Sequence, residues 1–322
     1  MIPKLELHLH LEGAAPPDFI RALAKEKHAD IGGIFDEAGN YKYRDFAEFL
    51  KVYEAATSVL KTPQDYYRLT REVLERCAEH GVIYAETFIS PDFCGGGDVA
   101  AWRDYMAAMQ AADDENPAIT LRGIVTCIRH FGPEAAKPAA LCAAETAGDW
   151  LVGFGMGGAE NVGRPGDFAW AFDAAREAGL RLTSHAGEWC GAQEVRRTLD
   201  ELPGMERIGH GVMAIEDADL VKRLADERIT LEVCPGSNVA LGVCSAWGKH
   251  PIARLRDAGV PVTVSTDDPP FFHTDMSREF DMLAETFGWG EEDFAALNQT
   301  ALQAAFCDDT TRDALAKTLK GN

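Results

Sequence analysis

The sequence lacks the features that mark membrane, secreted and disulfide-stabilised proteins. None of its 322 residues lies in a run of about 18 consecutive apolar residues, so no membrane span is expected. The first residues, MIPKLELHLH, contain no apolar segment of the kind found in signal peptides. The eight cysteines are scattered and form no C-x-x-C pair, which argues against a zinc ribbon or a disulfide framework. We therefore expect reduced thiols and a cytoplasmic protein.

Positive charge is also scarce. The 31 Lys and Arg residues are outnumbered by 52 Asp and Glu residues, which gives a net charge of −21. Nucleic acids, anionic membranes and highly phosphorylated ligands are bound through basic residues, so none of them is an expected partner. The charge does not indicate the substrate, and the sequence leaves the oligomeric state open.

Short apolar runs alternate with helical segments, such as residues 168–178 and 218–227, along the chain. Several of these segments end on Gly just before the next run, as in AEHGVIYAE, and Gly is a common helix stop. The alternation predicts parallel β/α structure, either a closed barrel or a doubly wound sheet. No Gly-rich phosphate loop follows the first run, which favours the barrel. We predict one domain, residues 1–322, forming a (β/α)8 TIM barrel with strands at 4–10, 82–89, 120–129, 151–156, 181–185, 207–210, 229–234 and 261–267.

The connection between the first two predicted strands is too long for one helix. It has about 70 residues, and apolar side chains recur at helical spacing in Phe46–Tyr53 and in Tyr66–Cys77. Two or more extra helices are therefore expected in this first β-to-α connection. They would lie at the face where barrel enzymes hold their active sites. They could form a lid over a pocket or simply enlarge the outer helical layer.

The first strand has an unusual alternation, ELHLHLEG, from Glu6 to Gly13. Residues two apart in a strand share a face. We therefore expect the four leucines on one face, and Glu6, His8, His10 and Glu12 together on the other. Two histidines so placed are either a metal site or ordinary surface residues.

Polar residues recur where the predicted strands end, and the C-terminal ends of barrel strands converge on one opening. Three imidazole nitrogens and one carboxylate oxygen suit a single zinc ion, although iron or manganese would also accept these ligands. Taken singly, such residues could be strand-end hydrogen-bonding groups, helix caps or turn residues. Their shared position at one end of the barrel favours a metal site. The residues are His8 and His10 closing the first strand, His185 at the tip of the fifth with Glu188 three residues later, His210 at the end of the sixth, and Asp267 and Asp268 at the end of the eighth.

The motifs HLHLEG, SHAGE, GHG, CPGSN and STDDP, in this order, resemble the adenosine deaminase family of zinc-dependent amidohydrolases over essentially the whole chain. The resemblance implies a (β/α)8 barrel with one zinc ion per chain and hydrolytic removal of the 6-amino group of a purine. It implies His8, His10, His185 and Asp267 as the metal ligands. Glu188 would be the acid facing purine N1, and His210 the base and orienting group. Asp268 would hydrogen-bond N7, and the backbone amide of Gly158 would approach N3.

Glu12 departs from the typical pattern. In typical adenosine deaminases this position is Asp, and its carboxylate reaches the ribose 5′-hydroxyl. Members that act on free adenine are similar to this chain at HLHLEG, whereas STDDP is the nucleoside-type spelling and GFGMGGAE differs from the adenine-type run. The resemblance thus ranks adenosine or 2′-deoxyadenosine first and adenine as the alternative, followed by a modified nucleoside such as 6-amino-6-deoxyfutalosine. AMP is disfavoured because no cluster of Lys and Arg is present to hold a phosphate.

Other classes of protein remain as alternatives. Hydrolases of phosphoesters or lactones use the same barrel, and many bind two metals through a lysine on the fourth strand. That strand reads LVGFGMG here and contains no lysine. A binding protein without catalysis would be expected if a ligand or Glu188 were missing, and none is. The H-x-E and P-C-x-x-C signature of cytosine-type zinc deaminases is absent.

Overall fold

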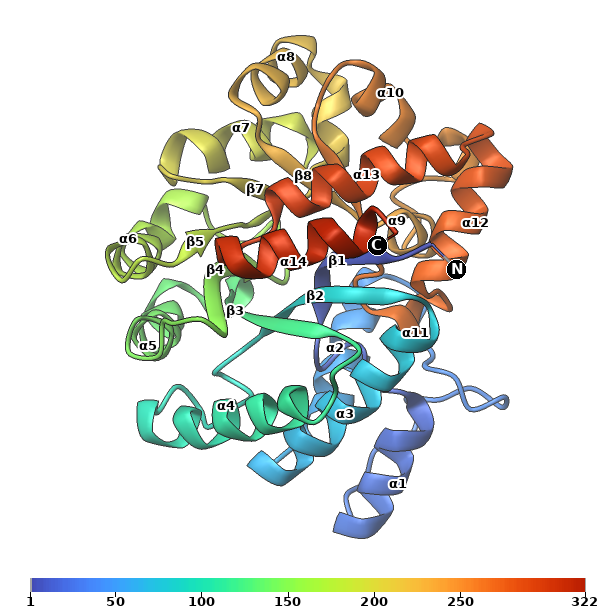
Figure 1. Ribbon diagram of the computed structural model, residues 1–322. Helices are drawn as coiled ribbons and strands as arrows, with labels where there is room; N and C mark the ends of the chain where they lie inside the picture. The colour runs from blue at the N-terminus through green and yellow to red at the C-terminus, as the bar shows by residue number, and fades with distance from the viewer. Residues whose placement is uncertain (1, 322) are drawn as a thin grey trace.

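The computed structural model describes residues 2–321 and shows a barrel of parallel strands surrounded by helices (Figure 1). The predicted TIM-barrel fold is therefore confirmed. The strands are β1 (Lys4–His10), β2 (Val82–Ile89), β3 (Thr120–Ile128), β4 (Leu151–Gly157), β5 (Arg181–Leu182), β6 (His185–Ala186), β7 (Arg207–His210), β8 (Thr230–Val233) and β9 (Val262–Val264).

Helices follow most strands, and α4 to α8 succeed one another around the outside of the barrel (Figure 1). Their ends are set by ordinary signals: Asp217 caps α8, for example, by accepting from the N–H groups of Asp219 and Leu220. The α-helices are α1 (Pro17–Lys27), α2 (Phe46–Thr57), α3 (Pro63–Glu79), α4 (Val99–Asp114), α5 (Pro133–Ala144), α6 (Ala169–Glu177), α7 (Gly191–Glu201), α8 (Ala218–Glu227), α9 (Pro235–Ala240), α10 (Ile252–Asp257), α11 (Pro269–Phe272), α12 (Met276–Phe287), α13 (Glu291–Ala304) and α14 (Asp309–Leu319). Short 3-10 turns are η1 (Arg129–Phe131), η2 (Pro165–Phe168), η3 (Val212–Glu216) and η4 (Trp247–Lys249).

Backbone hydrogen bonds close the barrel between its last and first strands. The N–H of Asp267, just beyond β9, donates to the carbonyl of His8 (3.0 Å), and the N–H of His10 donates to the carbonyl of Asp267 (3.0 Å). This seam brings residues some 260 positions apart to adjacent places at the C-terminal end of the barrel.

The predicted fifth strand, 181–185, is split into β5 and β6. Thr183 and Ser184 separate them, although Thr183 N–H still donates to the Phe154 carbonyl on β4 (3.1 Å). The Ser184 carbonyl accepts from Gly209 N–H on β7 (2.9 Å), so the two residues between β5 and β6 remain hydrogen-bonded to the neighbouring strands on both sides. The break leaves His185 at the start of a two-residue strand beside β7.

The expected alternation of β1 holds from His8 onward but is wrong in the first half of the strand, because the strand contains a bulge. Between Glu6 and Leu9, β1 has one residue more than its partner β2. Leu5 and Leu7 therefore pack with Tyr84 and helix α13, whereas Leu9 packs in the main core. Glu6 instead bonds Thr266 N–H (3.0 Å) and lies 3.9 Å from Cys77 on α3. The extra residue moves the side chains that follow it to the opposite face of the strand. His8 and His10 therefore point into the barrel, whereas Glu6 does not share their face.

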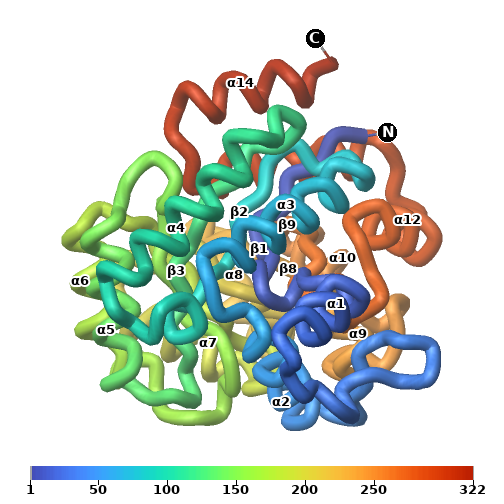
Figure 2. Tube along the Cα trace, turned by 90° about the horizontal axis from the view of Figure 1, so that it is seen from below, coloured from blue at the N-terminus to red at the C-terminus, as the bar shows by residue number. Residues whose placement is uncertain are grey.

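The first connection holds three helices, α1 to α3, which confirms the extra helices expected there. Helix α2 and helix α14 lie at opposite ends of the molecule (Figure 2). Helices α13 and α14 cover the end where β1 begins, and Leu302 and Leu315 pack there against Leu5 and Leu7. Within residues 2–321, no helix is long and apolar enough to cross a membrane.

Candidate active site and metal centre

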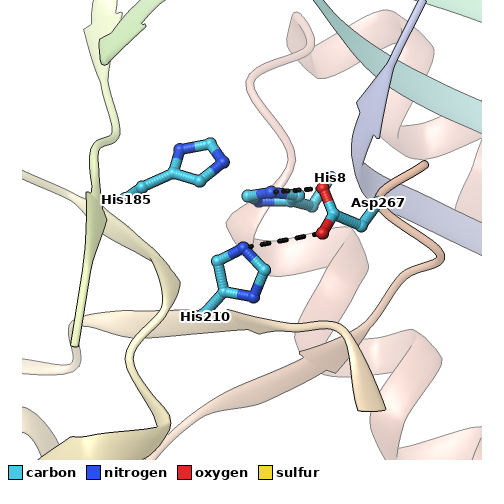
Figure 3. A group of neighbouring side chains, drawn as sticks. All are labelled: His8, His185, His210 and Asp267. Atoms are coloured by element: carbon cyan, nitrogen blue, oxygen red, sulfur yellow. Dashed lines mark ion pairs between the residues drawn. The ribbon is translucent and has the colours of Figure 1, made fainter. Parts of the chain in front are cut away.

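The structure brings His8, His185, His210 and Asp267 together at the C-terminal end of the strands (Figure 3). One ligand atom from each lies within 4.8 Å of the others. His10 joins them: its Nε2 is 3.1 Å from His185 Nε2 and 3.3 Å from an Asp267 carboxylate oxygen. His8, His185 and His210 form a buried group with Asp267, and the fourth expected ligand, His10, adjoins this group and is partly exposed.

His8 has the geometry of an oriented metal ligand. Its Nδ1 lies 2.7 Å from the Glu232 carboxylate on β8, while its buried Nε2 has no hydrogen-bond partner in the described chain. Glu232 is held in turn by Arg207 and by the hydroxyl of Thr183 (2.8 Å). A carboxylate behind a histidine fixes the ring and the free nitrogen for a metal.

His185 is fixed in the same way by a backbone carbonyl. Its Nδ1 donates to Met156 O on β4 (2.9 Å), so the lone pair of Nε2 faces His10 Nε2. Neutral imidazoles cannot direct their lone pairs at each other without a proton or a cation between them. The close nitrogens, the orphaned His8 Nε2 and the Asp267 carboxylate together fit a divalent cation.

Asp267 is held from several sides. Ser237 at the start of α9 donates its hydroxyl to Asp267 Oδ2 (2.7 Å). The backbone of Asp267 has a φ of +67°, a conformation uncommon for residues other than Gly. His210 also has a positive φ, +58°. Strained backbone at two neighbouring polar residues is typical of functional sites.

Glu188 is buried beside this cluster, with one carboxylate oxygen 3.8 Å from His210 Nε2. Burial, followed by the charges of Asp267 and Glu160, raises the pKa of Glu188 well above its usual range. These surroundings therefore favour the protonated, neutral form of the Glu188 carboxyl group.

Glu160, in the loop after β4, holds the segment that carries Glu188. Its carboxylate accepts the N–H groups of Gly187, Trp189 (2.8 Å) and Cys190 (3.0 Å). Glu160 is only 4% exposed, so these three bonds are sheltered from water. The backbone on both sides of Glu188 is thereby fixed to a neighbouring strand end.

His210 is also fixed from behind. Asn238 Nδ2 lies 3.2 Å from His210 Nδ1, and Asn238 Oδ1 lies 3.1 Å from His250 Nε2. All three side chains are almost fully buried.

A cavity opens beside the metal-binding cluster and Glu188, and Asp268 and Gly158, for which the resemblance implied contacts with the purine, lie on its wall. Burial, followed by the neighbouring Asp267, raises the pKa of Asp268 well above its usual range. Asp268 Oδ1 is buried with no partner among the described residues, so it can bond a ligand. Two glycines make room: a Cβ on Gly13 would lie 1.5 Å from Asp268 Oδ1, and one on Gly158 (φ +93°) would lie 2.6 Å from His130 Nδ1.

Glu12 faces the cavity and is 2% exposed. Tyr66 on α3 donates its hydroxyl to Glu12 Oε1 (3.0 Å), and Cys94 Sγ lies 3.8 Å from the same oxygen. Burial raises the pKa of Glu12 to about 7.

Helix α2 supplies an apolar wall opposite the polar cluster, and Phe46, Phe49, Leu50 and Tyr53 line the cavity there. Its Glu54 lies 3.2 Å from His130 Nε2, which joins α2 to η1 across the opening. The cavity thus pairs hydrogen-bonding groups with aromatic rings, a combination suited to a flat, polar, aromatic ligand.

Sequence reasoning did not identify the supporting residues Glu160, Glu232, Ser237, Asn238 and His250. Three had a usable signal, because Glu160 ends GFGMGGAE and the motif CPGSN contains Ser237 and Asn238. Glu232 lies in the middle of a predicted strand, where a charged residue is unusual. His250 follows no strand and offered no signal.

Known proteins are similar to this chain in sequence and in fold. A family model described as "Adenosine deaminase" matches residues 3–321. An adenine deaminase of Rhizobium rhizogenes is 49% identical over 317 residues, covering 98% of each chain. The crystal structure of an adenine deaminase from Arthrobacter aurescens superposes with a TM-score of 0.90 at 30% identity, covering 99% of this chain and 98% of that one. An amidohydrolase from Burkholderia ambifaria with bound Zn superposes with a TM-score of 0.85 at 27% identity, covering 100% and 93%.

Proposed function

Since this chain belongs to the adenosine deaminase family and is a hydrolytic purine deaminase, we propose that its substrate is free adenine, which it converts to hypoxanthine and ammonia. Relatives that share almost half of its residues over nearly the full length are named adenine deaminases. This reverses the order expected from STDDP and GFGMGGAE, which placed adenosine first. Those short motifs carry less weight than similarity along the whole chain.

Glu12 is the observation that carries the choice of adenine. It takes the place of the Asp that reaches the ribose 5′-hydroxyl in the typical enzymes that this chain resembles. Its side chain is one methylene longer, and Tyr66 holds it in the cavity wall. Less room is left for a sugar there, whereas a free base needs none.

One zinc ion per chain is part of the proposal, with His8, His10, His185 and Asp267 as ligands. Support comes from the close nitrogens, the orphaned His8 Nε2 and the zinc of the Burkholderia relative. A zinc ion held by these residues would lower the pKa of a water molecule enough to make it a nucleophile near neutral pH.

The chain's own residues have three tasks at the purine. Glu188, kept protonated by burial, delivers a proton to N1 as electrons move onto the ring during attack at C6. Asp268, whose pKa is raised by burial and by Asp267, donates a hydrogen bond to N7 through its unpartnered oxygen, and the amide of Gly158 approaches N3, where no side chain intervenes. Helix α2 covers the ring and excludes water.

The test is ammonia release from adenine, adenosine, 2′-deoxyadenosine and 6-amino-6-deoxyfutalosine by the purified protein. Adenine should give the highest kcat/KM, and a higher value for any nucleoside would overturn the substrate assignment. The Glu12→Asp variant tests the reason for it: the ratio of kcat/KM for adenosine to that for adenine should rise. An unchanged ratio would mean that Glu12 does not select against the sugar.

A further inference from the structure

We propose that a hydrogen-bond relay from the backbone of Ile252 through His250 and Asn238 fixes the tautomer of His210, so that His210 acts at the reacting atoms as an Nε2–H donor. This deepens the proposed function and rests on it for the identity of the reacting atoms. His250 and Asn238 are positioning residues, because they act through His210.

The relay begins at a group whose role is not ambiguous. The backbone N–H of Ile252, at the start of α10, lies 3.2 Å from His250 Nδ1. A backbone N–H can only donate, so His250 Nδ1 accepts and carries no proton. His250 is 3% exposed, and burial lowers its pKa to about 3, in keeping with a neutral ring. Its single proton is therefore on Nε2.

The second link sets the orientation of Asn238. His250 Nε2 donates across 3.1 Å, so the Asn238 atom facing it must be the amide oxygen. The two ends of an amide are usually told apart only by their partners. Here the N–H of Ile252 assigns the two ends, because it leaves the proton of His250 on Nε2. The NH₂ group of Asn238 must therefore face His210.

The third link determines His210. Asn238 Nδ2 donates to His210 Nδ1 at 3.2 Å, so that nitrogen has no proton, and the ring's proton is on Nε2. This Nε2 lies 3.8 Å from both Glu188 Oε2 and Asp267 Oδ2, too far for a hydrogen bond to either. The N–H is thus directed between two carboxyl groups and remains available to a ligand in the cavity.

The chemical consequence is a change of role for His210. The resemblance implied a base and orienting group, and only the orienting role remains, because a ring whose outward nitrogen already carries the proton cannot take another without breaking the bond from Asn238. As a donor it orients the oxygen nucleophile and stabilises negative charge that develops there during attack. Loss of one such donor typically lowers kcat by about 10²–10³-fold.

The direct test is histidine-selective ¹⁵N NMR of the full-length, zinc-loaded protein, which distinguishes protonated from unprotonated ring nitrogens. The His210→Asn and His250→Asn variants assign the signals. We expect the proton on Nε2 in both rings. A proton on Nδ1 of His210, or on both of its nitrogens, would overturn the proposal even if adenine is deaminated. Conversely, failure to deaminate adenine would remove the substrate assignment and leave this spectrum interpretable.

Two sets of variants test the role in catalysis. Asn238→Asp places an acceptor beside His210 Nδ1 and should move the proton to that nitrogen. It should lower kcat by about 10²–10³-fold with KM for adenine and zinc content little changed. A moved proton with wild-type kcat would contradict the donor role.

The second set replaces His250 and also serves if Asn238→Asp does not fold. His250→Phe removes the donor to Asn238, whereas His250→Gln keeps an N–H in its place. The His250→Gln variant should keep the His210 proton on Nε2 and recover part of the kcat that His250→Phe loses. An equal loss of kcat in both variants would count against the relay. His80→Gln is the remote control, because His80 pairs with Asp275 away from the cavity lining.

Discussion

Glu188 owes its proposed role to its surroundings, because a carboxyl group in water would be ionised at neutral pH. Replacing it with Gln keeps the shape and removes the proton that N1 needs. We expect Glu188→Gln to retain zinc and to lose about 10²–10⁴-fold in kcat. Steady-state kinetics with adenine, together with elemental analysis of zinc, measures both.

The matched control for this variant is Glu201→Gln, at the end of α7, where the carboxylate pairs with Arg164 near the surface. It should leave kcat unchanged. A Glu188→Gln enzyme with near-normal turnover would exclude Glu188 as the proton donor.

The raised pKa of Glu188 also gives a pH dependence. The protonated acid is the active form, so activity is present below the folded-state pKa and is lost as the pH rises through it. We expect kcat to fall on the alkaline side of the profile. The kcat–pH curve with adenine checks this, and a kcat that instead increases with pH across that range would mean that Glu188 works as a carboxylate.

At the scale of single residues, the sequence was informative about groups that face the cavity. His8, His185 and Asp267 end predicted strands, and strand ends of a barrel converge. Residues that hold them were harder to predict, because a partner such as His250 is chosen by three-dimensional proximity and not by periodicity. Glu12 was noticed from its chemistry, although its contact with Tyr66 needed the structure.

Among the secondary-structure elements, the loop after β4 has a specific task. Glu160 accepts three N–H groups around Glu188, and Gln can offer only one oxygen to them. We expect Glu160→Gln to lower kcat by about 10²-fold with little change in KM, because small displacements of a catalytic group are costly. Hydrogen exchange of the segment containing residues 187–190 should become faster.

Asp113→Asn is the control for Glu160→Gln. Asp113 is a carboxylate on α4 that accepts from Leu121 N–H (3.1 Å) and the Trp150 indole (3.2 Å), far from the strand ends that form the site. It should reduce stability and leave kcat unchanged. Normal kcat together with faster exchange in Glu160→Gln would show that the loop does not need to be held.

Strand positions were predicted well, but two details of the strands were not. The bulge in β1 depends on Ser265, whose hydroxyl accepts the N–H groups of both Leu7 (3.2 Å) and His8 (3.1 Å) from across the barrel seam. No local pattern in ELHLHLEG signals such a partner. The interruption at Thr183 and Ser184 likewise depends on the neighbouring strands.

For the whole molecule, the proposed metal ligands join both halves of the barrel, since they come from β1, from β6 and from the residue Asp267 just beyond β9. When the free metal concentration is 1,000 times the Kd, metal binding adds about 4 kcal/mol to the free energy of unfolding. For a chain of this length, chelation should therefore lower Tm by roughly 6 °C. Differential scanning calorimetry with and without a chelator measures the shift.

His185→Ala is the control for chelation, because it removes a ligand. It should bind little zinc, and its Tm should not respond to the chelator. An equal response in wild type and variant would place the stabilising metal elsewhere.

The order of elements made the barrel predictable, because strands and helices alternate throughout and the one long connection contains helical periodicity. The order of elements did not show how the barrel closes between its first and last strands. The bonds between His8, His10 and Asp267 depend on a seam between the two ends of the chain.

Both ends of the described chain lie opposite the opening of the site, since β1 begins and α14 ends near the covered end of the barrel (Figures 1 and 2). The protein could therefore be anchored to a solid support through either end with its entrance facing the bulk solution. A purine substrate would then approach an entrance that the support does not block.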